Sequence, residues 1–262
     1  MAFETILFDI QNCAARLTLN RPEKLNSFNV QMHLEIQTVL EKLEQDKGLR
    51  VLVLTGAGRG FCAGQDLSDR VIASEGKLDL GTSIENYYAP LVRRLRALPV
   101  PVIAAVNGVA AGAGANLALA CDIVIAAKSA SFIESFCKLG LIPDTGGTYF
   151  LPRLAGSARA MGMALLGDRI SAEQAATWGL IWRAIDDVDF RAATDSLVNQ
   201  LAVGPTKGFA YIKRALYASS QNSLDEQLKL ERDLMRELGN SQDFREGVTA
   251  FLEKREPRFI GK

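Results

Sequence analysis

The stretch Val102-Ile103-Ala104-Ala105-Val106 runs directly into Asn107-Gly108-Val109-Ala110-Ala111-Gly112-Ala113-Gly114, and helix-compatible sequence follows. Two further segments repeat this order of an apolar run, a glycine-containing loop and a helix, and they begin near residues 51–54 (VLVL) and 122–125 (DIVI). Continuous apolar runs are typical of strands that are covered on both faces. The repeated order therefore predicts an α/β fold.

The N-terminal segment predicts a pair of strands and a helix. Residues 5–8 and 15–19 indicate two paired strands around Gln11 and Asn12. Asn29 is a suitable N-cap for a helix, because apolar residues then recur at helical spacing, at Met32, Ile36, Val39, Leu40 and Leu43. His33 lies one position past this stripe, so we expect it to be a surface residue rather than a ligand.

The C-terminal part predicts helices, because strand signals thin out from about Ser157 onward. Ser171 with Gln174 and Ser223 with Glu226 match the capping-box pattern that begins a helix. Two apolar stripes follow, the first at Leu224, Leu228, Met235 and Leu238, the second at Phe244, Val248, Phe251 and Leu252. Such stripes are more often core or subunit interface than cofactor contacts. We predict a core over residues 1–195 and a helical region over residues 196–262.

Composition excludes several classes of function. The 262 residues include 30 basic and 30 acidic side chains with no long basic run, which disfavours a nucleic-acid partner. No apolar stretch approaches the roughly 20 residues of a membrane span, and no leader is visible, so we expect a cytoplasmic protein without a membrane partner. The cysteines are widely spaced and are interpreted as reduced thiols, at Cys13, Cys62, Cys121 and Cys137. Neither a metal nor a redox cofactor is implied.

The scarcity of histidine directs attention to one acid. His33 is the single histidine, so proton transfer must fall largely to carboxylates, lysines, tyrosines or thiols. Asp144 is the candidate catalytic residue, because it lies in an apolar loop ahead of a glycine pair, in residues 142–148 (IPDTGGT). Burial beside apolar neighbours, Leu141, Ile142 and Phe150, is expected to raise its pKa. The alternative is a loop aspartate that caps a helix opening at Gly147.

Two glycine-rich loops are candidates for a binding site, at residues 56–60 (GAGRG) and 108–114 (GVAAGAG). Neither has the spacing of a dinucleotide fingerprint with its downstream acid, and the chain lacks a nucleotide-hydrolase phosphate loop. Such loops expose backbone N–H groups, and two converging N–H groups form an oxyanion hole. The alternative is tight packing of each strand on the helix that follows it.

Four motifs in order resemble the enoyl-CoA hydratase/isomerase (crotonase) superfamily: residues 20–28 (NRPEKLNSF), 60–67 (GFCAGQDL), 107–116 (NGVAAGAGAN) and 143–148 (PDTGGT). The likeness continues to residues 251–255 (FLEKR). It implies a crotonase (ClpP-like) spiral of repeated ββα units with a C-terminal helical trimerisation region. It also implies a homotrimer or a hexamer built from two trimers.

The resemblance assigns roles residue by residue. The backbone N–H groups of Gln65 and Ala113 would hold a thioester carbonyl in the oxyanion hole. Coenzyme A, as part of the substrate rather than a cofactor, would be bound at its adenine and pantetheine parts by the backbone around Ala63, Gln65, Asp66 and Leu67, with the loop near Lys24 and Leu25. Phe251 and Lys254 match tail positions that reach the nucleotide end of coenzyme A from the same or a neighbouring subunit. For Lys254, a solvated helix face is the alternative.

Departures from the hydratase pattern indicate the subclass. Hydratases of this family use two glutamates, and their positions are occupied by Asn116 and Phe136, so hydration is not expected as the main activity. Asp144 falls where dienoyl-CoA isomerases and chlorobenzoyl-CoA dehalogenase keep an aspartate. The dehalogenase also needs a histidine base, and His33 lies in the wrong part of the chain, so dehalogenation is disfavoured. Glu134 is close to Asp144 in sequence, but the resemblance gives no support for a role as a second acid. An acyl pocket lined by Tyr87, Tyr88 and Phe136 is a further prediction.

The resemblance thus implies a proton shift next to a thioester. Asp144 would remove the α proton, the amides of Gln65 and Ala113 would hold the dienolate, and Asp144 would return the proton further along the conjugated system. The expected reaction converts ring-1,2-epoxyphenylacetyl-CoA to oxepin-CoA, with transient contact with phenylacetyl-CoA epoxidase. Two alternatives stay open: cis-3 to trans-2 enoyl-CoA isomerisation, and non-catalytic acyl-CoA binding.

Overall fold

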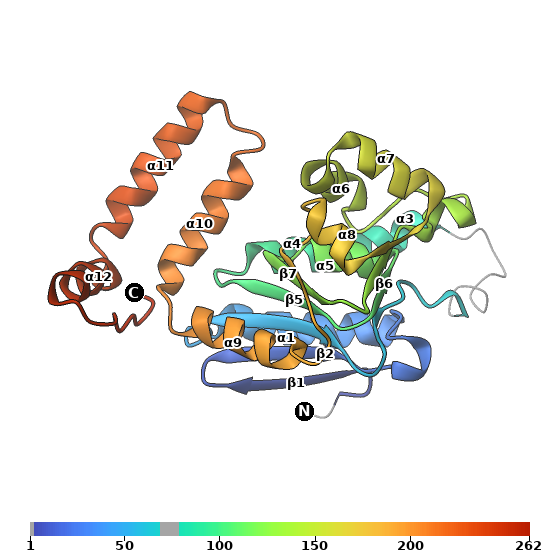
Figure 1. Ribbon diagram of the computed structural model, residues 1–262, viewed down its shortest axis with the longest axis horizontal. Helices are drawn as coiled ribbons and strands as arrows, with labels where there is room; N and C mark the ends of the chain where they lie inside the picture. The colour runs from blue at the N-terminus through green and yellow to red at the C-terminus, as the bar shows by residue number, and fades with distance from the viewer. Residues whose placement is uncertain (1–2, 69–78) are drawn as a thin grey trace.

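The computed structural model describes residues 3–68 and 79–262, and in them the chain forms two sheets. The six-stranded sheet has the order β1 (Ile6–Gln11), β2 (Ala14–Leu19), β3 (Val51–Gly56), β5 (Val102–Val106), β7 (Ile123–Ala127) and β10 (Arg183–Ile185) (Figure 1). The four-stranded sheet has the order β4 (Gly60–Cys62), β6 (Val109–Ala111), β8 (Ser131–Ile133) and β9 (Arg169–Ser171).

Successive turns of the chain place one strand in each sheet. β3 and β4, β5 and β6, and β7 and β8 are three such pairs; the first members pair in parallel with one another in the larger sheet and the second members in the smaller. Helices follow each pair: α3 (Leu80–Ser83), the π-helix η2 (Ile84–Tyr88) and α4 (Ala89–Ala97) after the first, α5 (Ala113–Leu119) after the second, and η3 (Ser135–Leu139), α6 (Gly147–Ala155) and α7 (Ser157–Leu166) after the third. The predicted α/β fold and spiral of ββα units are confirmed.

Local signals at the N-terminus act as predicted. β1 and β2 pair antiparallel, and the turn between them has positive φ at Asn12 and Cys13, as two-residue hairpin turns require. The 3-10 helix η1 (Pro22–Lys24) follows, and then α1 (Val30–Gln45). The side chain of Asn29 accepts a hydrogen bond from the backbone N–H of Met32, which makes it the N-cap of α1.

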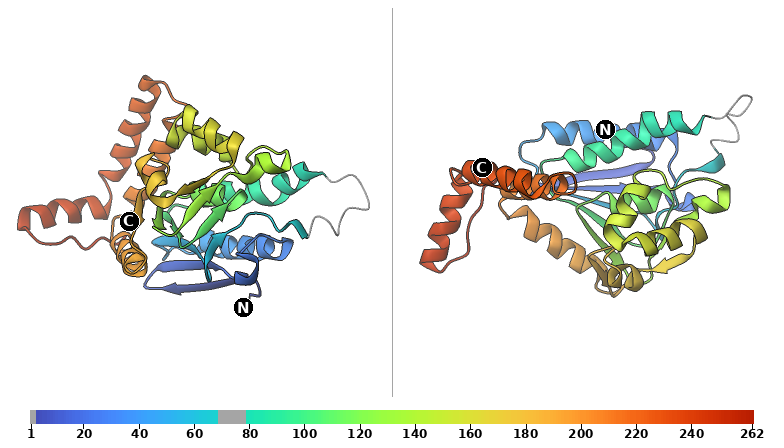
Figure 2. Two further views of the ribbon diagram at one scale, coloured as in Figure 1. Left: turned by 45° about the vertical axis from the view of Figure 1, so that its right-hand side comes forward. Right: turned by 90° about the horizontal axis from the view of Figure 1, so that it is seen from above.

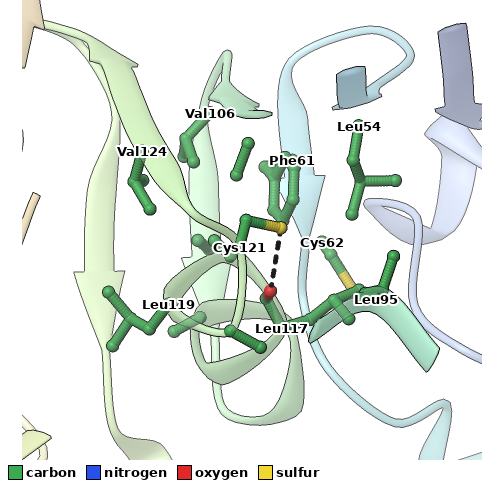
Figure 3. Close-up of a cluster of buried hydrophobic side chains, with 14 of the residues drawn as sticks. Leu54, Phe61, Cys62, Leu95, Val106, Leu117, Leu119, Cys121 and Val124 are labelled. Atoms are coloured by element: carbon green, nitrogen blue, oxygen red, sulfur yellow. Dashed lines mark hydrogen bonds between the residues drawn. The ribbon is translucent and has the colours of Figure 1, made fainter. Parts of the chain in front are cut away.

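The core is formed by side chains of the two sheets and of the helices that pack on them. Figure 3 shows part of it, in which side chains of β3, β4, β5, α4 and α5 meet around the buried thiols of Cys62 and Cys121. Burial raises the pKa of Cys62 to about 12 and raises that of Cys121 as well, so both thiols stay protonated. The thiol of Cys121 donates to the main-chain oxygen of Leu117.

The C-terminal helices leave the core. α8 (Ala172–Thr177) and α9 (Phe190–Ala202) still belong to it, since Val198 of α9 packs on the apolar face of the larger sheet. α10 (Thr206–Ala218) and α11 (Leu224–Leu238) then form a protruding pair, with α12 (Gln242–Glu253) at its end (Figures 1 and 2). The predicted division between residues 195 and 196 falls inside α9. No helix within residues 3–68 and 79–262 has the length and apolar character needed to cross a membrane.

The prediction for His33 is wrong, because its side chain is only 6% exposed. α1 packs against α4 as well as against β1, so its buried face is wider than the apolar stripe indicates. The imidazole lies among aromatic rings, with ring centroids 4.7 Å from Phe28, 5.1 Å from Tyr87 and 4.5 Å from Tyr88. Burial lowers its pKa to about 4, so the ring is neutral at pH 7.

Candidate active site

The two predicted oxyanion amides lie on neighbouring segments. β4 and β6 are paired in parallel, with Cys62 opposite Ala110, and the chain leaves each strand through a glycine, Gly64 or Gly112. Ala113 is the first residue of α5, where a backbone N–H has no acceptor inside the helix. Within the described residues, the backbone N–H groups of Gln65 and Ala113 donate to no acceptor of the chain. An oxyanion hole requires donors of this kind, which have no acceptor within the chain.

Gly64 permits the close approach of these two segments. Its φ is +91°, and a Cβ atom at this position would lie 2.9 Å from the main-chain oxygen of Ala111 and 3.4 Å from the nitrogen of Ala113. A side chain would therefore be strained and would occupy the space next to the Ala113 amide. The requirement for glycine at this point ties the motif at residues 60–67 to the geometry of the candidate oxyanion hole.

The predicted coenzyme A residues near the N-terminus are held against the same strand. The backbone N–H of Ala63 donates to the main-chain oxygen of Leu25 at 2.9 Å. The buried Asn26 side chain donates to the main-chain oxygen of Gly60 at 2.8 Å. The structure thus brings together Lys24, Leu25, Ala63, Gln65 and Asp66, with Leu67 exposed at the edge of this group.

Asp66 has an internal partner that the sequence reasoning missed. Its carboxylate lies 2.9 Å from the guanidinium of Arg21, and it also accepts hydrogen bonds from Ser68. These hydrogen bonds and the Arg21 charge, which outweigh burial, lower its pKa. Arg21 stood inside the quoted motif, but only the pairing of the two loops in space shows that it holds Asp66. The contact of Asp66 with coenzyme A stays a prediction.

Asp144 lies in a tight turn ahead of α6. The backbone N–H of Gly147 donates to the main-chain oxygen of Asp144 at 2.8 Å, and both residues between them have positive φ, +53° at Thr145 and +85° at Gly146. The hydroxyl of Thr145 donates to the carboxylate of Asp144 at 2.8 Å. α6 has Gly146 as its N-cap without a side-chain hydrogen bond, so the alternative interpretation of Asp144 as a helix cap is wrong.

The apolar cover expected for Asp144 comes only in part from its sequence neighbours. The side chain of Ile142 is 75% exposed and that of Leu141 is also exposed, whereas Phe150 is buried in the core. Asp144 as a residue is half-buried. In a single chain, therefore, one side of the Asp144 turn remains accessible to a substrate.

Asn116 connects Asp144 to α5. Its fully buried side-chain amide donates to the main-chain oxygen of Asp144 at 3.0 Å and to the carboxyl of Glu134 at 3.3 Å. Asn116 lies three residues after Ala113 on α5, a rise of about 4.5 Å along the helix. The candidate acid and the second oxyanion amide are thereby fixed to the same short helix.

Glu134 is a buried acid beside Asp144. Its side chain has no exposed surface, and one of its carboxyl oxygens has no hydrogen-bond partner among the described residues. Burial raises its pKa to about 8, and the negative charge of Asp144 adds to the increase, against the hydrogen bond from Asn116. The group is therefore mainly a neutral carboxylic acid at pH 7, which the chain position alone does not reveal.

Two aromatic residues of the predicted acyl pocket have different surroundings. The ring of Phe136 faces the oxyanion loop, since a Cβ atom at Gly112 would lie 3.5 Å from it. Tyr88 is only 1% exposed and its hydroxyl donates to the side-chain oxygen of Gln65. Tyr88 therefore lies below the loop that carries Gln65 rather than on an open pocket wall. The pocket as a whole remains a prediction.

A single chain does not bring Phe251 and Lys254 to this site. They lie at the end of α12, which is far from α5 and β6 in Figures 1 and 2. Phe251 is 82% exposed, and Lys254 is exposed in the left-handed C-cap position of α12. Any contact of these residues with a substrate at Gln65 would have to involve a neighbouring copy of the chain.

The chain matches the family model described as enoyl-CoA hydratase/isomerase over residues 9–262. It is 58% identical to 1,2-epoxyphenylacetyl-CoA isomerase of Escherichia coli (strain K12), covering 99% of each chain. It is 51% identical to a probable enoyl-CoA hydratase of Rhodobacter capsulatus, covering 100% of each chain. It is also 35% identical to trans-2-decenoyl-[acyl-carrier-protein] isomerase of Streptococcus mutans over the whole length of both.

Solved structures show the same fold. A putative enoyl-CoA hydratase/isomerase from Mycobacterium abscessus superposes with a TM-score of 0.93 at 36% identity, covering 98% of this chain and 100% of the other. A putative enoyl-CoA hydratase from Streptomyces coelicolor superposes with a TM-score of 0.93 at 34% identity, covering 100% of this chain and 96% of the other.

Proposed function

Because the chain belongs to the enoyl-CoA hydratase/isomerase family and is an isomerase, we propose that it converts ring-1,2-epoxyphenylacetyl-CoA to oxepin-CoA. The epoxide is in equilibrium with its seven-membered oxepin form. The reaction breaks the C–H bond α to the thioester carbonyl, forms a double bond between the α carbon and the ring, and places the proton on a ring carbon. Composition is unchanged, so neither water nor a redox partner is consumed.

The paired amides supply the stabilisation of the intermediate. Loss of the α proton leaves negative charge on the thioester oxygen, and the N–H groups of Gln65 and Ala113 would donate hydrogen bonds to that oxygen without reorganisation. Each donor of this kind contributes about 3 kcal/mol. The backbone of Leu25 and Ala63, on the adjoining segments, would hold the coenzyme A portion alongside.

The single observation that carries the proposal is the set of groups around Asp144. The two positions where hydratases of the family keep glutamates hold Asn116 and Phe136, and Asn116 uses its amide to hold the Asp144 loop. A single carboxylate at Asp144 suits a proton shift within one molecule, in which the same acid takes and returns the proton while the two amides hold the thioester oxygen. A single acid is less suited to the addition of water, because a second group is needed to activate the water molecule.

A second candidate is the conversion of a cis-3-enoyl-CoA to a trans-2-enoyl-CoA. It uses the same acid and the same amides, and the similarity to an isomerase whose name gives trans-2-decenoyl-[acyl-carrier-protein] supports it. Non-catalytic acyl-CoA binding is the third candidate. The half-buried Asp144, held in a strained turn by hydrogen bonds, argues against it, because such strain is typical of functional sites.

We further propose a homotrimer, alone or paired into a hexamer. The protruding helices expose large apolar side chains, including Ile212, Leu216, Leu228, Met235, Phe251 and Leu252, and α7 exposes Met161, Leu165 and Leu166. Apolar surface on this scale is typical of subunit interfaces. Assembly would carry Phe251 and Lys254 toward the coenzyme A of a neighbouring subunit. Transient contact with the phenylacetyl-CoA epoxidase would pass on the reactive epoxide directly.

The test uses the purified protein with ring-1,2-epoxyphenylacetyl-CoA, made enzymatically, and separately with a cis-3-enoyl-CoA. The products are followed by chromatography. Oxepin-CoA formation with the higher kcat/KM supports the leading proposal. A higher kcat/KM for the alkenyl thioester moves the assignment to the second candidate. Turnover of neither, with retained binding of the thioesters, supports the third.

A further inference from the structure

The side chain of Gln65 is held from two directions. The hydroxyl of Tyr88 donates to its side-chain oxygen at 2.8 Å. Its own side-chain N–H group donates to the main-chain oxygen of Phe28 at 3.0 Å and to that of Asp66 at 3.3 Å. The side-chain amide thus connects Tyr88 on one side with Phe28 on the other, and its oxygen and nitrogen both have partners.

The main chain around Gln65 depends on the same contact with Phe28. The backbone N–H of Phe28 donates to the oxygen of Gly64 at 2.7 Å, and the N–H of Asp66 donates to the oxygen of Phe28 at 2.8 Å. This short parallel bridge uses the groups on both sides of Gln65 and leaves the Gln65 N–H directed away from Phe28. The bridge holds the peptide that carries the candidate oxyanion N–H through the oxygen of Gly64, and the side-chain amide adds a second restraint on Gln65 through the oxygens of Phe28 and Asp66.

Tyr88 is the last residue of a π-helix. The five residues of η2 (Ile84–Tyr88) separate α3 from α4, and the N–H of Ala89 closes the wide turn by donating to the oxygen of Ile84. One additional residue per turn rotates the following side chains by about 100° relative to a regular α-helix. π-helical turns are rare and occur frequently at functional sites. Here the turn places the Tyr88 hydroxyl against Gln65.

The ring of Tyr88 is packed against other aromatic rings. Its ring makes an edge contact with His33, with centroids 4.5 Å apart, and another with Phe28, with centroids 5.8 Å apart. Tyr88 and Phe28 are both buried, and neutral His33 fills the space between α1 and η2. The hydroxyl is therefore presented to Gln65 from a fixed support, which is what a group needs in order to hold another within a fraction of an ångström.

We propose that Tyr88 is a positioning residue for thioester activation, whose hydroxyl acts through the Gln65 side chain to aim the Gln65 backbone N–H at the substrate carbonyl. The inference rests on the proposed function for its kinetic consequence. It assigns to the Gln65 side chain a role in addition to that of its main chain. Tyr88 itself makes no contact with the reacting atoms in this assignment.

The kinetic test is Tyr88→Phe, which removes the hydroxyl and retains the ring. Complete loss of an oxyanion donor costs about 10²–10³-fold in kcat, so a misdirected donor is expected to lower kcat about tenfold. KM is expected to stay within about twofold, because Tyr88→Phe retains the ring and leaves unchanged every residue that is assigned to coenzyme A binding. Tyr211→Phe is the matched control, since that hydroxyl contacts Glu237 on the protruding helices and its loss should leave kcat unchanged.

A double variant distinguishes positioning from a general effect on folding. Gln65→Met keeps the main chain and the length of the side chain but removes both of its hydrogen-bonding groups. If Tyr88 acts through Gln65, Tyr88→Phe should lower kcat about tenfold in the wild type and should change nothing in the Gln65→Met background. An equal loss in both backgrounds, or no loss in either, would overturn the inference.

A spectroscopic readout keeps the inference separate from the proposed reaction. 4-Dimethylaminocinnamoyl-CoA is a conjugated thioester whose absorption shifts to longer wavelength when its carbonyl accepts strong hydrogen bonds. Bound to the wild type it should show a red shift that decreases in Tyr88→Phe and is retained in Tyr211→Phe. An unchanged shift in Tyr88→Phe overturns the positioning role, even if ring-1,2-epoxyphenylacetyl-CoA is turned over. A wild type with the shift but without turnover overturns the proposed function alone.

Discussion

The side-chain amide of Asn116 lies 3.0 Å from the main-chain oxygen of Asp144, and this hydrogen bond ties α5 to the turn ahead of α6. The main chain at Asp144 and the Ala113 amide are thereby connected through one turn of α5.

Asn116→Ala should therefore affect both activity and stability. The main-chain oxygen of Asp144 would keep its bond from Gly147 and lose the one from Asn116, which costs about 0.5–1.5 kcal/mol of unfolding free energy. The Asp144 turn would also shift relative to Ala113, so we expect kcat for oxepin-CoA formation to fall about tenfold or more. Urea unfolding and steady-state kinetics measure the two effects. The exposed Asn199→Ala is the control, and an active, fully stable Asn116→Ala would contradict this role.

Glu134→Gln should change how stability depends on pH. Burial raises the pKa of Glu134 from an ordinary value of 4.5 to about 8. Between these values the folded state holds a proton that the unfolded state releases, so the contribution of Glu134 to stability is complete below pH 4.5 and is lost as pH rises through 8. Glutamine is neutral throughout, so Tm of the variant should exceed that of the wild type by an amount that grows across this window. A constant difference between pH 5 and 8 would be evidence against the buried, neutral acid.

His33→Phe should have the opposite pH signature. The pKa of His33 falls from 6.5 to about 4 on burial, so the unfolded state binds a proton that the folded state does not. Its contribution to stability is present above pH 6.5 and is lost as pH falls toward 4. Phenylalanine retains the ring contacts and removes a buried nitrogen without a partner among the described residues. The variant should lose less stability than the wild type between pH 6.5 and 4, and a parallel loss in both would show that His33 is not the titrating group.

Lys213 should be essential for holding the protruding helices to the core. Its ammonium lies 2.7 Å from the carboxylate of Asp122 and also donates to the main-chain oxygens of Leu98 and Val100. Lys213→Met leaves the carboxylate of Asp122 without its charged partner. Loss of one member of a buried ion pair costs about 3–5 kcal/mol of unfolding free energy. Lys207→Met removes an exposed pair on the same helix and should cost about 1 kcal/mol or less. Similar urea midpoints for the two variants would contradict this difference.

The strands and glycine turns that carry the site can be predicted from the sequence, because each depends on neighbouring residues in the chain. Strands β3, β5 and β7 are buried on both faces, and this burial requires continuous apolar runs that are visible in one dimension. Gly64 is required because its main chain lies close to that of Ala111 and Ala113, where any side chain would obstruct the contact. The glycine in the motif therefore indicates this geometry. The turn at Asp144 is visible for the same reason, through the glycine that follows it.

The remaining relationships depend on packing that no local pattern records. Tyr88 and Gln65 are 23 residues apart, and their contact depends on the phase of a π-helix. The burial of His33 depends on α4 lying over α1, which the spacing of α1 alone cannot show. The proposed roles of Phe251 and Lys254 would need a neighbouring chain, and a contact of that kind is not visible in a single sequence.

The measurement that tests the central claim most directly compares the wild type, Asp144→Asn and the exposed control Asp168→Asn on ring-1,2-epoxyphenylacetyl-CoA. Thioester affinity is measured in the same samples. Asparagine has the shape of the carboxylate but cannot take a proton, so kcat should fall by about 10²–10⁴-fold while the thioester Kd stays within a few-fold of the wild type. The control should match the wild type in both quantities. Near-normal turnover by Asp144→Asn would contradict the assignment of the proton shift to Asp144.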